Sequence, residues 1–102
     1  MRNNMEACEE VLRKEGYDSH NELLHEWALL LALSRSEQYS AECESFERRY
    51  GMKIEEFEKG LRQGKGREDF EREEDLDDWE FCLNAMKWWK DKVKELQGAA
   101  HA

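Results

Sequence analysis

The apolar residues of this chain recur mainly at three- and four-residue spacing, which is the spacing of one helix face. The first such stripe comprises Met5, Cys8, Val11 and Leu12. It predicts a short helix over about residues 4–15, with Gly16 as its C-terminal cap. Because so short a helix is unstable alone, we expect residues 1–18 to dock on the rest of the chain.

The longest apolar segment, Leu23–Leu33, is apolar around most of a helix circumference. A helix of this kind is buried on several sides, so the segment is predicted to be the central core element, or a core element that also carries a self-association face. Polar residues Ser34–Gln38 interrupt the pattern. We expect the helix to continue through them, with a break there as the alternative, and to end at Gly51. A long helix is therefore predicted over about residues 19–50.

The second half of the chain contains a short predicted helix at about residues 53–62 and a longer one at about residues 76–97. A glycine-containing spacer, residues 60–67, and an acidic connector, residues 68–80, lie between them. The last helix has a heptad-like apolar seam formed by Trp79, Cys82, Met86, Trp89, Val93 and Leu96. Gly98 is predicted to end this helix and to leave a frayed tail over residues 98–102.

The composition favours helix throughout and offers little from which to build a sheet. There is no proline, and the residues that favour strands are few. A length of 102 residues fits one domain. We therefore predict a single all-α domain over residues 1–102, arranged as a small helical bundle.

The charge balance excludes some classes of partner. The chain has 16 basic and 25 acidic residues, for a formal net charge of −9. Nucleic-acid binding usually needs a basic face, so no direct nucleic-acid contact is expected, whereas a basic protein partner would be electrostatically complementary. No apolar run is long enough to cross a membrane, and the start lacks the apolar region of a signal peptide.

The three cysteines, Cys8, Cys43 and Cys82, lack disulfide or zinc spacing and lie in apolar helical patterns. We interpret all three as buried thiols of a reducing compartment, which predicts a cytoplasmic protein.

Motifs that could carry chemistry are weak. Glu22 and His25 have the Glu-x-x-His spacing of a carboxylate-bridged metal bundle, but no second copy of the motif is present. The Gly64–Arg67 segment lacks the spacing of a phosphate-binding loop. No nucleophile motif is recognisable, so neither a cofactor nor an enzymatic activity is expected.

Helix packing does not explain two features of the sequence. One is the dense run of carboxylates in residues 68–80, and the other is Trp88, which lies off the apolar seam together with Phe81. Large aromatic residues outside a core are typical of interfaces, although a third helix covering that face is the alternative. The candidate partner-binding residues are Phe70, Glu73, Glu74, Asp77, Asp78, Trp79 and Trp88.

The chain also resembles a known class of small proteins over residues 28–97. The resemblance lies in Phe46-Glu47-Arg48-Arg49-Tyr50-Gly51-Met52, Glu55-Glu56-Phe57, Gly64, Glu68-Asp69-Phe70-Glu71 and Asp77-Asp78-Trp79-Glu80. In this pattern the chain is similar to presumed antitoxins encoded beside short toxin genes in archaea and bacteria. The resemblance implies a protein partner encoded by the adjacent gene, and it implies no catalytic residue.

The leading hypothesis is therefore a non-enzymatic acidic protein-binding module, of the kind an antitoxin would use against a basic toxin. A self-associating structural protein that forms a homodimer is the alternative. A metal-binding bundle built on Glu22 and His25 is a third reading.

Overall fold

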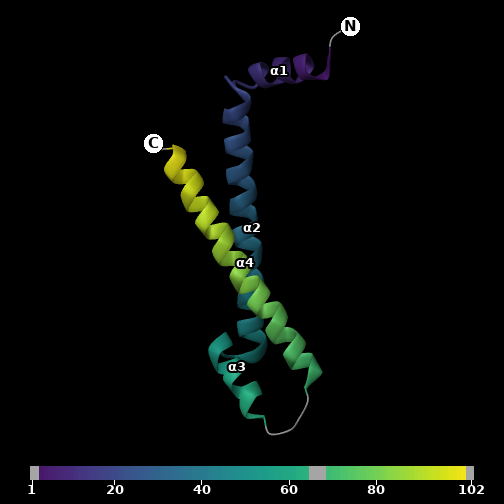
Figure 1. The fold of residues 1–102 in the computed structure, drawn as a ribbon, viewed down its shortest axis with the longest axis vertical. Coiled ribbons are helices and arrows are strands. Elements are labelled where there is room, and N and C mark those ends of the chain that lie inside the picture. Colours follow the sequence, from purple (N-terminus) through teal and green to yellow (C-terminus); the bar gives the residue numbers. More distant parts are fainter. Residues whose placement is uncertain (1–2, 65–68, 101–102) are drawn as a thin grey trace.

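The computed structural model describes residues 3–64 and 69–100, and all regular structure within these ranges is helical. The helices are α1 (Asn4–Lys14), α2 (His20–Tyr50), α3 (Ile54–Gln63) and α4 (Phe70–Ala100). Figure 1 shows α2 and α4 as a long antiparallel hairpin, with α3 at its closed end and α1 across the far end of α2. The predicted all-α class and the pair of long helices are confirmed.

The hairpin is held by matching apolar seams on its two helices. On α2, the residues at positions 32, 36, 39, 43, 46 and 50 are buried or half-buried, and so is the predicted α4 seam from Trp79 to Leu96. Near the open end, Nε2 of His25 donates a hydrogen bond to the carbonyl oxygen of Leu96 at 2.8 Å. Seams that repeat every three and four residues keep facing each other along two packed helices, which explains the length of the contact.

Local sequence sets the ends of α2. The backbone N–H of Glu22 donates to Oγ of Ser19 at 3.2 Å, and the carboxylate of Glu22 accepts from the N–H of Asp18 at 3.0 Å. At the other end Gly51 adopts the left-handed conformation with φ 66°, which favours glycine. The helix is continuous through residues 34–38, where buried Ser36 donates its hydroxyl to the carbonyl of Leu33.

The last helix starts earlier than predicted. It begins at Phe70 and not near residue 76, because Asp69 accepts a hydrogen bond from the N–H of Arg72 at 3.1 Å and caps it. Acidic side chains in the first turn also favour the positive end of the helix dipole. The acidic connector is therefore mostly helical. Gly98 does not end the helix either, since α4 continues to Ala100.

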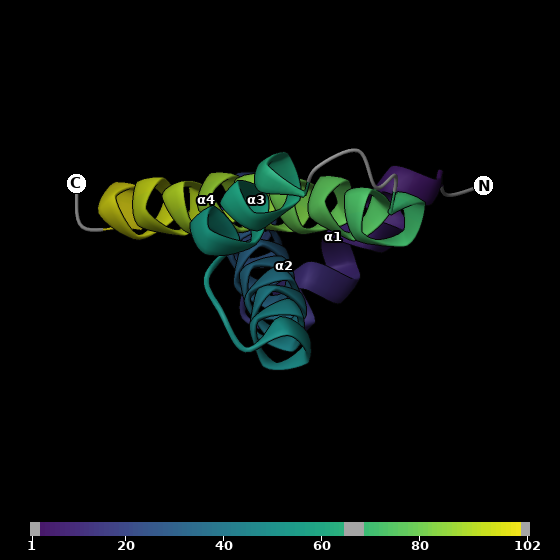
Figure 2. The same ribbon diagram turned by 90° about the horizontal axis from the view of Figure 1, so that it is seen from below.

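The start of α3 and the glycine spacer differ in detail from the prediction. Residue 53, the N-cap of α3, is a lysine and forms no side-chain cap. Residues 60–63 of the predicted spacer belong to α3, and residues 65–68 lie outside the described part of the chain, as do 101–102 of the predicted tail. Figure 2, a view from below, shows α3 lying against α4.

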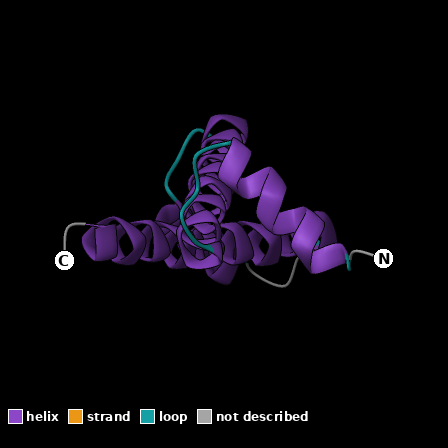
Figure 3. Ribbon diagram, turned by 90° about the horizontal axis from the view of Figure 1, so that it is seen from above, coloured by secondary structure: helices purple, strands orange, loops and turns teal. Residues whose placement is uncertain are grey.

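The core lies at the closed end of the hairpin and not in the Leu23–Leu33 segment. Its buried residues are Cys43, Phe57, Trp79 and Cys82. Within residues 23–33 only Ala32 is buried, while Leu24 and Trp27 are 68% and 62% exposed. The prediction that this segment forms the central core is wrong, because α4 covers only one side of α2 and α1 turns away across its end (Figure 3).

The cysteines separate into two classes. Cys43 and Cys82 are buried as predicted, whereas Cys8 is exposed, because no other element covers its side of α1. Among the described residues no helix is long and apolar enough to span a membrane.

We expect thiol reagents to distinguish these classes. In native protein, one thiol should react rapidly and two slowly, because Cys43 and Cys82 are shielded and burial raises the pKa of both. Ellman titration of the native chain, compared with Cys8→Ser, measures this directly. Loss of the fast phase in Cys8→Ser is the expected result, and three equally fast thiols would contradict the described packing.

Candidate protein-interaction surfaces

The first surface is the acidic end, which we define as the side chains of Phe70–Glu80 of α4 other than the buried Trp79, together with Glu58 of α3. Phe70 is 70% exposed, and Glu73, Glu74, Asp77 and Asp78 are also exposed. Within the described residues none of these four carboxylates forms an ion pair or accepts a side-chain hydrogen bond. The structure thus brings together five of the seven residues that the sequence singled out.

An open hollow of about 480 Å³ lies between α3 and α4 at this end. It is lined by Glu58, Leu61, Arg62, Glu73, Leu76, Asp77 and Glu80. Four of these side chains are carboxylates, and two are half-buried leucines. Arg62 already pairs with the carboxylate of Glu58 at the margin of the hollow. The leucines and the other three carboxylates, Glu73, Asp77 and Glu80, suit the aliphatic stem and charged head of a partner's lysine or arginine.

The acidic end is held in place by contacts with the end of α2. The half-buried carboxylate of Asp75 accepts hydrogen bonds from the Tyr50 hydroxyl and, at 3.0 Å, from the Arg49 guanidinium. The hydrogen bond to Asp75 raises the pKa of Tyr50, with burial adding to the effect. Arg72 lies over the Tyr50 ring at 5.9 Å. These contacts fix the first turns of α4, so the carboxylates of the acidic end sit on a rigid element.

The two tryptophans named with the acidic residues lie elsewhere. Trp79 is 1% exposed, and its ring lies 5.6 Å from that of Phe46 and 5.5 Å from that of Phe57. Its predicted place on a binding surface is corrected, because the same residue occupies the α4 seam. Trp88 is 53% exposed, as its off-seam position predicts, but lies five helical turns from Phe70, about 27 Å along α4. It packs edge-on against Trp89 with Lys92 over its ring.

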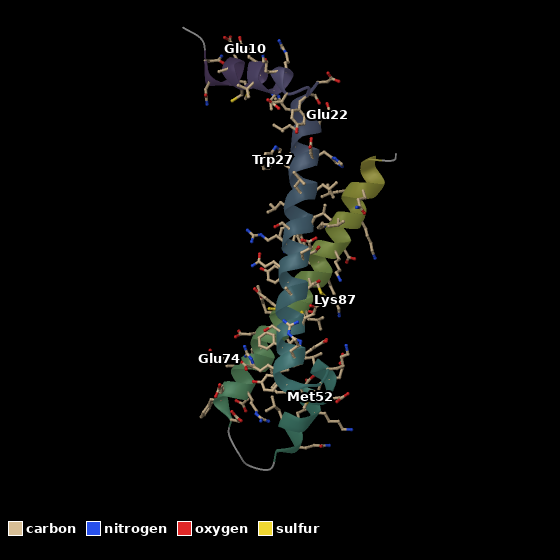
Figure 4. The ribbon with its side chains drawn as sticks, turned by 180° about the vertical axis from the view of Figure 1, so that it is seen from behind. Glu10, Glu22, Trp27, Met52, Glu74 and Lys87 are labelled. Atoms are coloured by element: carbon tan, nitrogen blue, oxygen red, sulfur yellow. The ribbon has the colours of Figure 1, made fainter. Side chains whose placement is uncertain are left out.

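The second surface lies within the Leu23–Leu33 segment, for which a self-association face was one of the two predictions, although none of its residues was among the candidate partner-binding residues. It is the outer strip of α2, which we define as Leu24, Trp27 and Leu31, with Leu30 beside them. All four side chains are exposed. In Figure 4 Trp27 projects from the side of α2 that faces away from α4. The sequence carries the signal, since Leu23–Leu33 is apolar around most of the helix circumference, but that pattern does not distinguish a core face from an interaction face.

The residues suggested for a metal centre have other roles. Glu22 accepts from the N–H of Asp18 and caps the start of α2, whereas His25 donates to Leu96 of α4, so both side chains have structural partners. Within the described ranges no group of three or more potential metal ligands occurs.

Comparison of the chain with protein-family models, with curated proteins and with solved structures finds no match. The resemblance to antitoxins is not tested by these comparisons and stays a prediction from the sequence. The two surfaces have to be interpreted from their own geometry and charge.

Proposed function

We propose that this chain is a protein-binding module whose acidic end docks on a basic surface of another protein. The observation that carries the proposal is the hollow between α3 and α4, where Glu73, Asp77 and Glu80 lie around half-buried leucines, beside the ion pair of Glu58 with Arg62. The net charge of −9 would also attract a basic partner over distance and speed the encounter.

The arrangement suits binding because the ligand groups are exposed and their support is rigid. In the free protein the exposed carboxylates remain hydrated. A cationic side chain that enters the hollow would contact several carboxylates at the same time. Phe70 projects beside them and offers apolar area of the kind that anchors protein interfaces. Asp75 is already engaged by Tyr50 and Arg49, so it serves the fold and not the partner.

In the form suggested by the antitoxin resemblance, the partner is a basic toxin encoded by the adjacent gene. A toxin that acts on RNA must present cationic side chains to phosphates. An anionic protein surface seated on those side chains would block access of the nucleic acid. This function requires no catalytic residue in the present chain.

Neutralising the acidic end should weaken binding to the product of the adjacent gene. The triple variant Glu73→Gln, Glu74→Gln, Asp77→Asn removes three exposed carboxylates and changes the formal charge from −9 to −6. Since exposed ion pairs each contribute about 0.2–1 kcal/mol, we expect the affinity to fall roughly tenfold, measured by isothermal titration calorimetry.

A matched variant separates position from net charge. Glu6→Gln, Glu37→Gln, Asp91→Asn also takes the formal charge to −6, but all three residues are exposed and lie outside the acidic end. It should retain nearly the original affinity. Equal loss of affinity in both triple variants would mean that only the overall charge matters and that the hollow is not the site.

A further inference from the structure

The outer strip of α2 continues beyond its apolar residues as an uncharged helical seam. Positions four, three, four, three and four residues apart are occupied by His20, Leu24, Trp27, Leu31, Ser34 and Gln38. All six are exposed, although 40% of the chain is charged. At about 1.5 Å per residue the seam is about 27 Å long. Its heptad spacing is that of a helix that packs against another helix.

At the first position of this seam, Nε2 of His20 lies 3.8 Å from Oε1 of Glu9 in α1. From Leu24 onward no helix of the described part of the chain runs along the seam. The α4-facing seam of α2 runs through Ala32, Ser36 and Cys43, which lie on the opposite side of the helix by their spacing. The first helix crosses the end of α2 and does not run along it (Figures 1 and 3). The apolar middle of the seam, Leu24 to Leu31, is therefore left in water.

The radius of gyration and the accessible surface area of the molecule are both larger than expected for a compact monomer, which is consistent with a missing packing partner. Its radius of gyration is 21.1 Å, whereas a compact chain of this length has about 13 Å. Its accessible surface is 8306 Å², whereas about 6,100 Å² is expected for a compact monomer of this mass. The excess of about 2,200 Å² exceeds the roughly 800 Å² that each partner buries in an interface of standard size.

From these observations we infer that the outer strip of α2 is a dimer interface at which two copies of this chain pack strip against strip. The absence of carboxylates in the strip favours a second copy of the chain over a basic partner. A basic partner finds no carboxylate in the strip to pair with, whereas a second copy, itself at −9, can approach there without opposing carboxylates. A two-fold axis through the strip makes the apolar patch complementary to itself.

The strip and the acidic end lie on different parts of the molecule. The strip occupies the first half of α2, and the acidic end lies at the opposite, closed end of the hairpin, as Figure 1 shows. A dimer formed through the strip leaves both acidic ends accessible. The inference therefore stands independently of the proposed function, and either can fail without the other.

Sedimentation equilibrium of the full chain tests the inference. Over protomer concentrations of roughly 5 to 200 µM, where mass action shifts such equilibria, we expect a mass approaching twice the 12.2 kDa of one chain. The mass should change little between low and high salt, because apolar contact is not screened. A wild-type chain that stays at 12.2 kDa over this range would overturn the inference.

Variants locate the interface. Trp27→Glu with Leu31→Glu should give the single-chain mass while far-ultraviolet circular dichroism keeps its helical signal, because both side chains are exposed. The control Trp88→Glu changes an equally exposed tryptophan on α4 and should remain dimeric. If the double variant with two glutamates loses its helical signal, the uncharged double variant Trp27→Gln with Leu31→Gln replaces it in the same measurement. Dimers that survive the strip variants, or that are lost equally in Trp88→Glu, would overturn the inference.

Discussion

Replacing Trp79 with alanine should lower the free energy of unfolding by about 3–5 kcal/mol. Trp79 is 1% exposed and has ring contacts with Phe46, Tyr50 and Phe57, so it joins three of the four helices. Its neighbours in the core, Cys43, Phe57 and Cys82, are themselves buried and held by packing, so they can fill the cavity only in part. A domain of this size is stable by roughly 5–15 kcal/mol, so the variant should be partly unfolded under mild conditions.

Urea denaturation followed by circular dichroism measures this effect. Phe70→Ala is the matched control, since this large aromatic side chain lies on the same helix but is exposed, and its loss should cost no more than about 0.5 kcal/mol. Similar midpoints for the two variants would contradict the assignment of the core to the closed end.

Alkaline pH should destabilise the fold through the buried thiol of Cys82. Burial, together with the hydrogen bond that the thiol donates to Glu42 at 2.9 Å, raises the pKa of Cys82 to about 12. A raised pKa means that the folded protein holds this proton more tightly than the unfolded chain. The stabilisation is thus fully present below the pKa of the unfolded thiol, near 8.5, and falls as pH rises toward 12, by about 1.4 kcal/mol per pH unit.

The variant Cys82→Ser isolates this contribution. Serine keeps a hydroxyl donor for Glu42 but does not titrate in this range, and Tyr50 and Cys43, whose pKa values are also raised, are present in both proteins. Denaturation of both proteins between about pH 8 and pH 11 should show the wild type losing stability faster, by about 1 kcal/mol per unit or more. Parallel pH profiles would show that the thiol is not held protonated by the fold.

The sequence predicts the hairpin well because the seams are simple periodic patterns. Trp79 to Leu96 and the stripe ending at Tyr50 lie where their spacing places them, and Gly51 ends α2 with the expected conformation. The start of α4 was predicted too late because an acidic run was interpreted as a connector. Only the cap at Asp69 and the helix dipole make that run helical.

Other features depend on which element covers which face, and periodicity does not supply that information. The Leu23–Leu33 segment is apolar around most of its circumference, which indicates that more than one of its sides packs against something but does not identify the packing partner. Cys8 lies in an apolar stripe that no other helix covers. The hollow at the acidic end forms only where α3 and α4 come together, so the sequence singles out Glu73 and Asp77 but neither Glu58 of α3 nor the hollow that these carboxylates share.

The most direct test of the account is the salt dependence of binding at the acidic end. The affinity of the chain for the product of the adjacent gene should be measured from about 0.1 M to about 1 M salt, over which the Debye length falls from about 10 Å to about 3 Å. We expect affinity to decrease steeply for the wild type and less steeply for the variant with Glu73, Glu74 and Asp77 neutralised. Binding that does not change with salt, or the absence of binding at low salt, would contradict the central claim.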